Sequence, residues 1–158
     1  MNTQELNERV QNELSNYDEK IIALAQYLGI DLEPNFSNVD EEASQEEREE
    51  QISEAIADVL SELDNIVDEG DNLFSYYSQE YNVCTDSEAD DLWEEELNMY
   101  IDECILPEIP KHLQNYFDEE AWKSDARFDG RGHAISRYDG HENEEEVNNT
   151  IYYIYRQN

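Results

Sequence analysis

Basic residues are scarce in this sequence. Only 9 Lys and Arg residues accompany 42 Asp and Glu residues, so the formal net charge is −33 over 158 residues. A small domain needs a net charge of magnitude only about 2 to 8 to stay soluble, so solubility does not explain the excess. Self-repulsion on this scale destabilises a compact chain. Direct binding of nucleic acid is disfavoured, because these carboxylates would repel phosphates.

Cysteines are few, and long apolar runs are missing. Cys84 and Cys104 are the only cysteines, which is too few for a disulfide framework, and their spacing is not that of zinc ligands. No apolar run approaches the roughly 20 residues that a membrane span needs. The N-terminal sequence lacks the basic and apolar regions of a signal peptide. We therefore expect a cytoplasmic protein.

The sequence also lacks a motif for catalysis or for binding metals. The only histidines are His112, His133 and His141, and they do not have the spacing of zinc ligands. Residues 64–72 lack the alternating Asp and Asn residues and the final Glu of a calcium loop. Carboxylates are so frequent that a close pair of them says nothing about acid–base catalysis. We expect no enzyme activity, metal or cofactor, and a metal-dependent hydrolase is the least favoured class.

Enough apolar residues are present for a folded core. Hydrophobic residues make up 38% of the chain and aromatic residues 11%, more than a disordered acidic chain would have. Apolar residues recur every three or four positions over residues 4–28, about 40–68 and about 85–105, which predicts three long amphipathic helices. Gly29 and Gly70 are expected to end the first two, and Thr85 and Glu88 have capping-box spacing. Shorter helices are expected at 73–81 and 112–124.

The last part of the sequence has a different character. Glycines gather at positions 130, 132 and 140, and residues 150–156, TIYYIYR, are β-branched and aromatic, which favours a strand. We expect residues 132–138 to pair with this strand across a long acidic turn. The predicted fold is therefore mainly α with a small C-terminal antiparallel β-hairpin (α+β). Residues 1–125 would form an elongated acidic helical domain, and residues 126–158 a hairpin appendage packed on it.

The acidic residues are unevenly placed. Arg48 is the only basic residue between Asp31 and Glu108. In the second predicted helix, carboxylates recur at every fourth position, where neighbouring like charges each cost about 0.2–0.5 kcal/mol. A helix from 40 to 68 would be roughly 40 Å long, comparable to about a dozen base pairs of duplex. We call these residues the acidic ladder: Glu46, Glu50, Glu54, Asp58 and Glu62.

Two further acidic clusters follow along the chain. The first contains Asp90, Asp91, Glu94, Glu95 and Glu96, and the second contains Asp118, Glu119 and Glu120. Carboxylates about 5–6 Å apart approach the spacing of phosphates along a strand. We expect the ladder and both clusters to imitate phosphates and to contact a protein that normally binds nucleic acid. The simpler interpretation is that these residues are solvated faces of an acidic protein.

The segments Ile105-Leu106-Pro107-Glu108 and Tyr116 to Asp125 resemble a segment of ArdA-type antirestriction proteins from phages and mobile elements. The endings Gly130 to His133, Tyr138 to Gly140 and Tyr152 to Arg156 are similar to those of such phage proteins. The resemblance covers roughly residues 100–158, and Glu119 and Lys123-Ser124 depart from the family's segment. It implies a DNA mimic that occupies the DNA-binding groove of a type I restriction-modification enzyme, often as a homodimer.

Two alternatives remain open at this point. An anti-CRISPR protein that blocks the nucleic-acid groove of a Cas effector would use the same acidic surface. An acidic assembly or chaperone module would instead contact a basic partner through its apolar helix faces. The expected partner in the leading hypothesis is a host defence protein, with no direct contact to nucleic acid or membrane. Added salt distinguishes the classes, because it weakens charge pairing but not apolar association.

Overall fold

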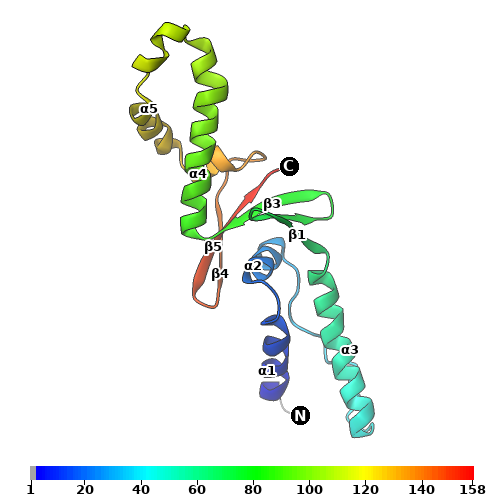
Figure 1. Ribbon diagram of the computed structural model, residues 1–158. Helices are drawn as coiled ribbons and strands as arrows, with labels where there is room; N and C mark the ends of the chain where they lie inside the picture. Colours follow the sequence, from blue (N-terminus) through cyan, green and yellow to red (C-terminus); the bar gives the residue numbers. More distant parts are fainter. Residues whose placement is uncertain (1–2) are drawn as a thin grey trace.

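The computed structural model describes residues 3–158, in which six α-helices lie on the two sides of one five-stranded antiparallel sheet (Figure 1). The helices are α1 (Thr3–Leu14), α2 (Glu19–Leu28), α3 (Gln45–Leu63), α4 (Asp86–Tyr100), α5 (Glu119–Ala126) and α6 (Arg131–Ile135). The strands are β1 (Ile66–Gly70), β2 (Leu73–Tyr76), β3 (Gln79–Cys84), β4 (Asn143–Val147) and β5 (Thr150–Arg156). The fold is thus mainly α with a smaller antiparallel β part, as predicted.

Short irregular helices connect α4 to α6. A π-helical turn, Ile101–Ile105, continues α4, and 3-10 turns follow at Leu106–Glu108, Lys111–Tyr116 and Arg127–Asp129. In Figure 1 this segment and α5 turn back beside α4 and form an arm that projects from the sheet. Helices α1 and α3 extend from the other side of the sheet. The molecule is therefore elongated, with the sheet in its middle.

The sheet has the strand order β1-β2-β3-β5-β4, so the final strand lies inside it. Two of its hairpins close on two-residue turns in which both residues have positive φ: Asp71 and Asn72 between β1 and β2, and Asn148 and Asn149 between β4 and β5. Asn and Asp tolerate this conformation better than other non-glycine residues, and such turns match the twist of paired strands. Local turn chemistry therefore fixes the register at both ends of the sheet.

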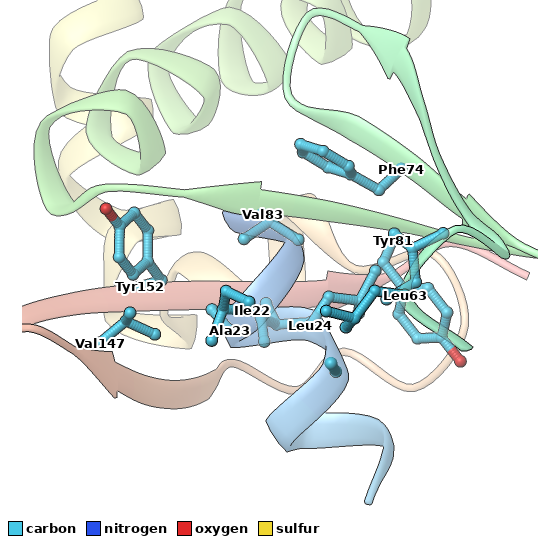
Figure 2. Packing of buried hydrophobic residues seen from close by; sticks show 12 residues of the cluster. Ile22, Ala23, Leu24, Leu63, Phe74, Tyr81, Val83, Val147 and Tyr152 are labelled. Atoms are coloured by element: carbon cyan, nitrogen blue, oxygen red, sulfur yellow. The ribbon is translucent and has the colours of Figure 1, made fainter. Parts of the chain in front are cut away.

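Both faces of the sheet are covered, which follows from the alternation of side chains along β5. Tyr152 and Ile154 belong to the main core with α2, whose buried residues are Ile22, Ala23, Leu24 and Ala25 (Figure 2). Tyr153 and Tyr155 point to the other face, where they meet residues of α4 and α6. Successive side chains of a strand point to opposite faces, so one aromatic strand supplies both cores.

A third apolar cluster joins α1 to α3. Val10 of α1 packs against Ile52 and Ile56 of α3, with Phe36 and Val39 of the connecting segment at its edge. The buried residues of α3 recur every three or four positions, so only one side of this helix is covered. The opposite side is left to solvent.

The helix predictions for the first hundred residues need three corrections. The first predicted helix is two helices, because Asp18 accepts a hydrogen bond from the Lys20 backbone N–H and starts α2 anew. The second ends at Leu63 rather than near residue 68. Residues 66–81 are strands, not the end of one helix and a further helix. Phe74 and Tyr81 are direct cross-strand partners, so their spacing of seven reflects a hairpin and not two helical turns.

The predicted helix over residues 112–124 and the pairing of the C-terminal hairpin are also wrong. The first is a 3-10 turn followed by α5, and Asp118 caps α5 by accepting from the Ala121 N–H. The partner of β5 within the last segment is β4, residues 143–147, which lies in the predicted acidic turn. Residues 131–135 form α6. The division into two domains at residue 125 stays a prediction, although β3 and β5 are neighbours in one sheet.

The close approach of α6 to the chain before β4 makes Gly132 a testable position. A Cβ atom on Gly132 would lie 2.7 Å from the Glu142 backbone nitrogen and 2.7 Å from the Gly140 carbonyl oxygen. We expect Gly132→Ala to lower the free energy of unfolding by about 1–3 kcal/mol, the usual cost of overpacking. Urea denaturation would measure this.

Gly29→Ala is the control for the Gly132 experiment. Gly29 has φ +75, and a Cβ atom on it would have no neighbouring heavy atom within 4 Å. Only the left-handed backbone therefore costs energy there, about 1–2 kcal/mol per residue. A larger side chain, as in Gly132→Val, should worsen the effect at position 132. Equal stability of Gly132→Ala and the unchanged protein would contradict the close packing of α6.

Candidate functional site

The acidic ladder lies on the solvent side of α3. All five of its residues are exposed, whereas Ile52, Ile56, Val59 and Leu63 on the same helix are buried. Ser44 starts the helix by accepting a hydrogen bond from the Glu47 N–H. The helix has 19 residues, so its length is about 28 Å at about 1.5 Å per residue. The helix that carries the ladder is therefore shorter than the roughly 40 Å that the sequence suggested.

Most carboxylates of the ladder have no partner in the described part of the chain. Within residues 3–158, no ion pair or side-chain hydrogen bond involves Glu46, Glu50, Glu54 or Asp58. Glu62 contacts Tyr76, whose hydroxyl pKa is raised by burial and by nearby groups that include Glu62. The like charges along the helix therefore repel one another, and no ion pair with a described residue neutralises these four carboxylates.

The cluster on α4 is divided between structural and free carboxylates. Glu94 accepts hydrogen bonds from Lys123 at 2.7 Å and from Arg127 at 2.6 Å, and Asp90 pairs with Arg131 at 2.9 Å. Glu96 lies 3.8 Å from Arg137. Asp91 and Glu95 are exposed and form no ion pair with a described residue. Asp90 and Glu94 are thus neutralised by close ion pairs, whereas Asp91 and Glu95 remain available.

The third cluster is mainly part of the α5 structure. Asp118 caps α5, and Glu120 lies 3.7 Å from Lys123, one turn further along the helix. Glu119 is exposed and, among the described residues, has neither an ion pair nor a side-chain hydrogen bond. The structure does not bring the three acidic groups together, because α3 lies on one side of the sheet and α4 and α5 on the other (Figure 1).

Acidic residues on the two edge strands were not among the predicted site residues. Asp68 and Glu69 on β1, and Glu144 and Glu146 on β4, are exposed. Charged side chains on an edge strand discourage pairing with a strand of another chain. The two-residue turns Asp71-Asn72 and Asn148-Asn149 were the signals that could have identified these strands.

The scarce basic residues hold the arm and the sheet together. Arg131 of α6 donates to Glu142 at 2.7 Å, and to Asp86 at 2.8 Å and Asp90 at 2.9 Å in the first turns of α4. Its guanidinium carbon lies 4.5 Å from the ring centre of Tyr153. Burial opposes the charge of Arg131, but hydrogen bonds to Glu142 and Asp86 outweigh burial and raise its pKa. Arg131 is therefore a charged hub that joins α4, α6 and β5.

Lys123 and Lys20 make two further connections of this kind. The Lys123 side chain is only 6% exposed, and its hydrogen bond to Glu94 raises its pKa while lowering that of Glu94. Lys20 of α2 donates to Asn72 and to Glu88 of the α4 capping box. Within residues 3–158, Arg48, Lys111 and Arg156 form no ion pair. Most cations are thus committed to internal contacts.

Other kinds of site find little support in the described residues. No group of three or more His, Cys, Asp or Glu side chains in residues 3–158 is arranged to hold a metal ion. No described helix combines the length and apolar character required to cross a membrane. Cys84 is buried, and burial raises its thiol pKa to about 11, which makes it unreactive.

Comparisons with protein-family models, curated proteins and solved structures find no match to this chain. The resemblance to ArdA-type proteins therefore stays a prediction. A function must therefore be inferred from where the charges and cavities lie in the fold.

Replacing Arg131 tests the role of this largely, but not fully, buried cation. Arg131→Gln leaves Asp86, Asp90 and Glu142 close together without their shared partner, so we expect a loss of about 2–4 kcal/mol in the free energy of unfolding. Arg137→Gln is the matched control, because Arg137 is 67% exposed and lies 3.8 Å from its acidic neighbour. Its loss should be below about 1 kcal/mol. Equal losses of stability in the two variants would contradict the role of Arg131 as a charged hub.

The Glu88 carboxyl gives a pH-dependent prediction. Partial burial opposes its ionisation, but hydrogen bonds from Lys20 and Thr85 prevail and lower its pKa to about 2 from 4.5. Because the folded pKa lies below the unfolded one, the stabilisation is complete above about pH 4.5 and is lost as the pH falls towards 2. We expect Glu88→Gln to be less stable by about 1–2 kcal/mol at pH 6, a value reduced for solvent screening.

Denaturation of the unchanged protein and Glu88→Gln across this pH range would measure the difference between them. The difference should shrink between pH 4.5 and 2, even though protonation of other carboxylates relieves repulsion in both proteins. A difference that does not change with pH would show that the ion pair with Lys20 contributes nothing.

Proposed function

We propose that this protein is a counter-defence protein of a phage or mobile element, active in the cytoplasm of the host cell and without enzyme activity. Its carboxylates would imitate DNA phosphates and occupy the DNA-binding groove of a host restriction-modification enzyme. The observation that carries this proposal is the acidic ladder, whose exposed charges repel one another and have no cationic partners on Glu46, Glu50, Glu54 and Asp58 among the described residues.

The position of the basic residues supports the proposal. A protein that bound to a basic groove would be repelled by exposed cations on the same face. Arg48 is the one cation of α3, and it is only partly exposed. On the other side of the sheet, Arg131 and Lys123 are directed inward, where Asp86, Asp90 and Glu94 neutralise them.

The dimensions of α3 suggest a short mimic. From Glu46 to Glu62 the helix rises about 24 Å, with one ladder carboxylate about every 6 Å. One DNA strand carries a phosphate about every 3.4 Å of its axis. The ladder therefore spans the length of about seven base pairs at reduced charge density, and we expect other contacts to add to its affinity.

The resemblance of residues 100–158 to ArdA-type proteins is the reason to choose a type I restriction-modification enzyme as the target. The experiment is a competition assay, in which the protein displaces a labelled DNA duplex from such an enzyme. Charge pairing with counterion release should make the inhibition fall steeply between about 50 and 200 mM salt. Inhibition that is constant or rises with salt would favour the apolar assembly module. Displacement of nucleic acid only from a Cas effector would keep the mimicry and change the target.

Neutralising the ladder should weaken inhibition without destabilising the fold. We expect the triple variant Glu50→Gln, Glu54→Gln, Asp58→Asn to inhibit at least about tenfold less, since interfacial charges steer and fix the complex. It should also be more stable by about 1–2 kcal/mol, because all four like-charge contacts in α3 are relieved. Competition assays and urea denaturation would measure the two effects.

A control variant removes the same number of charges elsewhere. Glu108→Gln, Glu144→Gln, Glu146→Gln changes exposed carboxylates outside the ladder and should retain most of the inhibition. Equal loss in both triple variants would show that total charge, and not the ladder, determines binding.

A further inference from the structure

A pocket of about 530 Å³ lies within the arm, between α4 with its π-helical turn and the returning segment with α5 and α6. Leu97, Tyr100 and Trp122 are among its apolar walls. Glu96, Glu103 and Asp129 line it as well. The helices α4, α5 and α6 that line the pocket lie on the opposite side of the sheet from α3, which carries the acidic ladder (Figure 1).

An aromatic surface forms part of the pocket. The rings of Tyr100 and Trp122 are stacked, with centroids 5.4 Å apart and planes 6° from parallel. Tyr100 is nevertheless 53% exposed, so the stack does not bury it. An accessible aromatic face attracts a cation within about 6 Å, and a planar guanidinium can also stack on it.

The carboxylates around this aromatic surface are only partly neutralised. Arg137 lies on the rim, and its nearest carboxylate is Glu96 at 3.8 Å. Within the described residues, Glu103 and Asp129 form no ion pair or side-chain hydrogen bond. His133 is the other titratable basic group in the lining. Uncompensated carboxylates beside an aromatic face are the groups that recognise a guanidinium.

We propose that this pocket receives an arginine side chain of the basic partner. The inference rests on the proposed function, because nucleic-acid-binding grooves present Arg and Lys. The chemistry favours arginine over lysine, since only a planar guanidinium combines stacking with paired hydrogen bonds to carboxylates. A nucleobase would also stack on Tyr100, but its phosphate would meet Glu96, Glu103 and Asp129. The pocket supplies a contact beyond the ladder.

The first experiment uses N-acetyl-arginine amide as the probe and N-acetyl-lysine amide as its control. Both carry one positive charge, so general attraction to the acidic protein is the same. Titration followed by the NMR signal of the Trp122 indole N–H should show saturable binding in the millimolar range for the arginine amide. We expect it to bind roughly fivefold more tightly than the lysine amide.

Matched variants assign this binding to the pocket. Glu103→Gln with Asp129→Asn should weaken binding of the arginine amide about three- to tenfold, as expected for two partly exposed charge contacts. Glu144→Gln with Glu146→Gln removes the same charge from the sheet edge and should leave binding unchanged. No saturable shift, equal binding of both amides, or equal effects of the two double variants would overturn the proposal.

A second experiment connects the pocket to the partner. Tyr100→Leu removes the exposed aromatic face and leaves the ladder intact, and circular dichroism would confirm that it folds. We expect the salt-sensitive inhibition of the defence enzyme to weaken about three- to tenfold. Unchanged inhibition by Tyr100→Leu would overturn the role of the pocket while leaving DNA mimicry standing. If the unchanged protein displaces no nucleic acid but binds the arginine amide selectively, the proposed function fails and the pocket chemistry stands.

Discussion

Repulsion among carboxylates is the constraint on which the rest of this structure depends. With 42 acidic and 9 basic residues, the chain cannot pair each carboxylate, and a compact state brings like charges closer together. The available cations lie where several carboxylates must meet: Arg131 among Asp86, Asp90 and Glu142, and Lys123 beside Glu94 and Glu120. Along the outer side of α3, the carboxylates make no contact that the fold needs, and their mutual repulsion is not neutralised.

Burial of apolar residues on both faces of the single sheet offsets this repulsion. Strand β5 contributes Tyr152 and Ile154 to one core and Tyr155 to the other. Buried tyrosines also donate hydrogen bonds to acids of the fold, with Arg131 as a second donor to Glu142. The Tyr152 hydroxyl donates to Glu19, and that of Tyr155 to Glu142. Burial and the hydrogen bond to Glu19 raise the pKa of Tyr152 to about 12, so it remains a neutral donor.

The sequence was informative where one local signal decides the structure. The capping box of Thr85 and Glu88 and the left-handed Gly29 are both present, because each depends on neighbours within a few residues. The ladder follows from spacing alone once α3 is helical. The strands β1 to β3 were missed because Phe74 and Tyr81 are seven residues apart, a spacing that a helix and a short hairpin both produce.

The division of the α4 carboxylates could not be read from the sequence. Asp90 and Glu94 look the same as Asp91 and Glu95 until the helix is placed against Arg131 and Lys123, which lie 41 and 29 residues later than their partners. The aromatic pocket could not be predicted from the sequence for the same reason, because Tyr100 and Trp122 meet only when the chain turns back at Pro107 and Pro110. Long-range packing therefore determines which charges are available to a partner.

The place of β5 inside the sheet has a consequence for the order in which the protein folds. Helix α2 is among the first elements of the chain, yet its Glu19 accepts from Tyr152, 133 residues later. Contacts of such long separation carry a large entropy of loop closure and slow folding. During synthesis the apolar side of α2 and the open edge of β3 are exposed until the last strand emerges. The acidic surroundings then act as a safeguard, because chains of the same high charge repel one another before their sheets are complete.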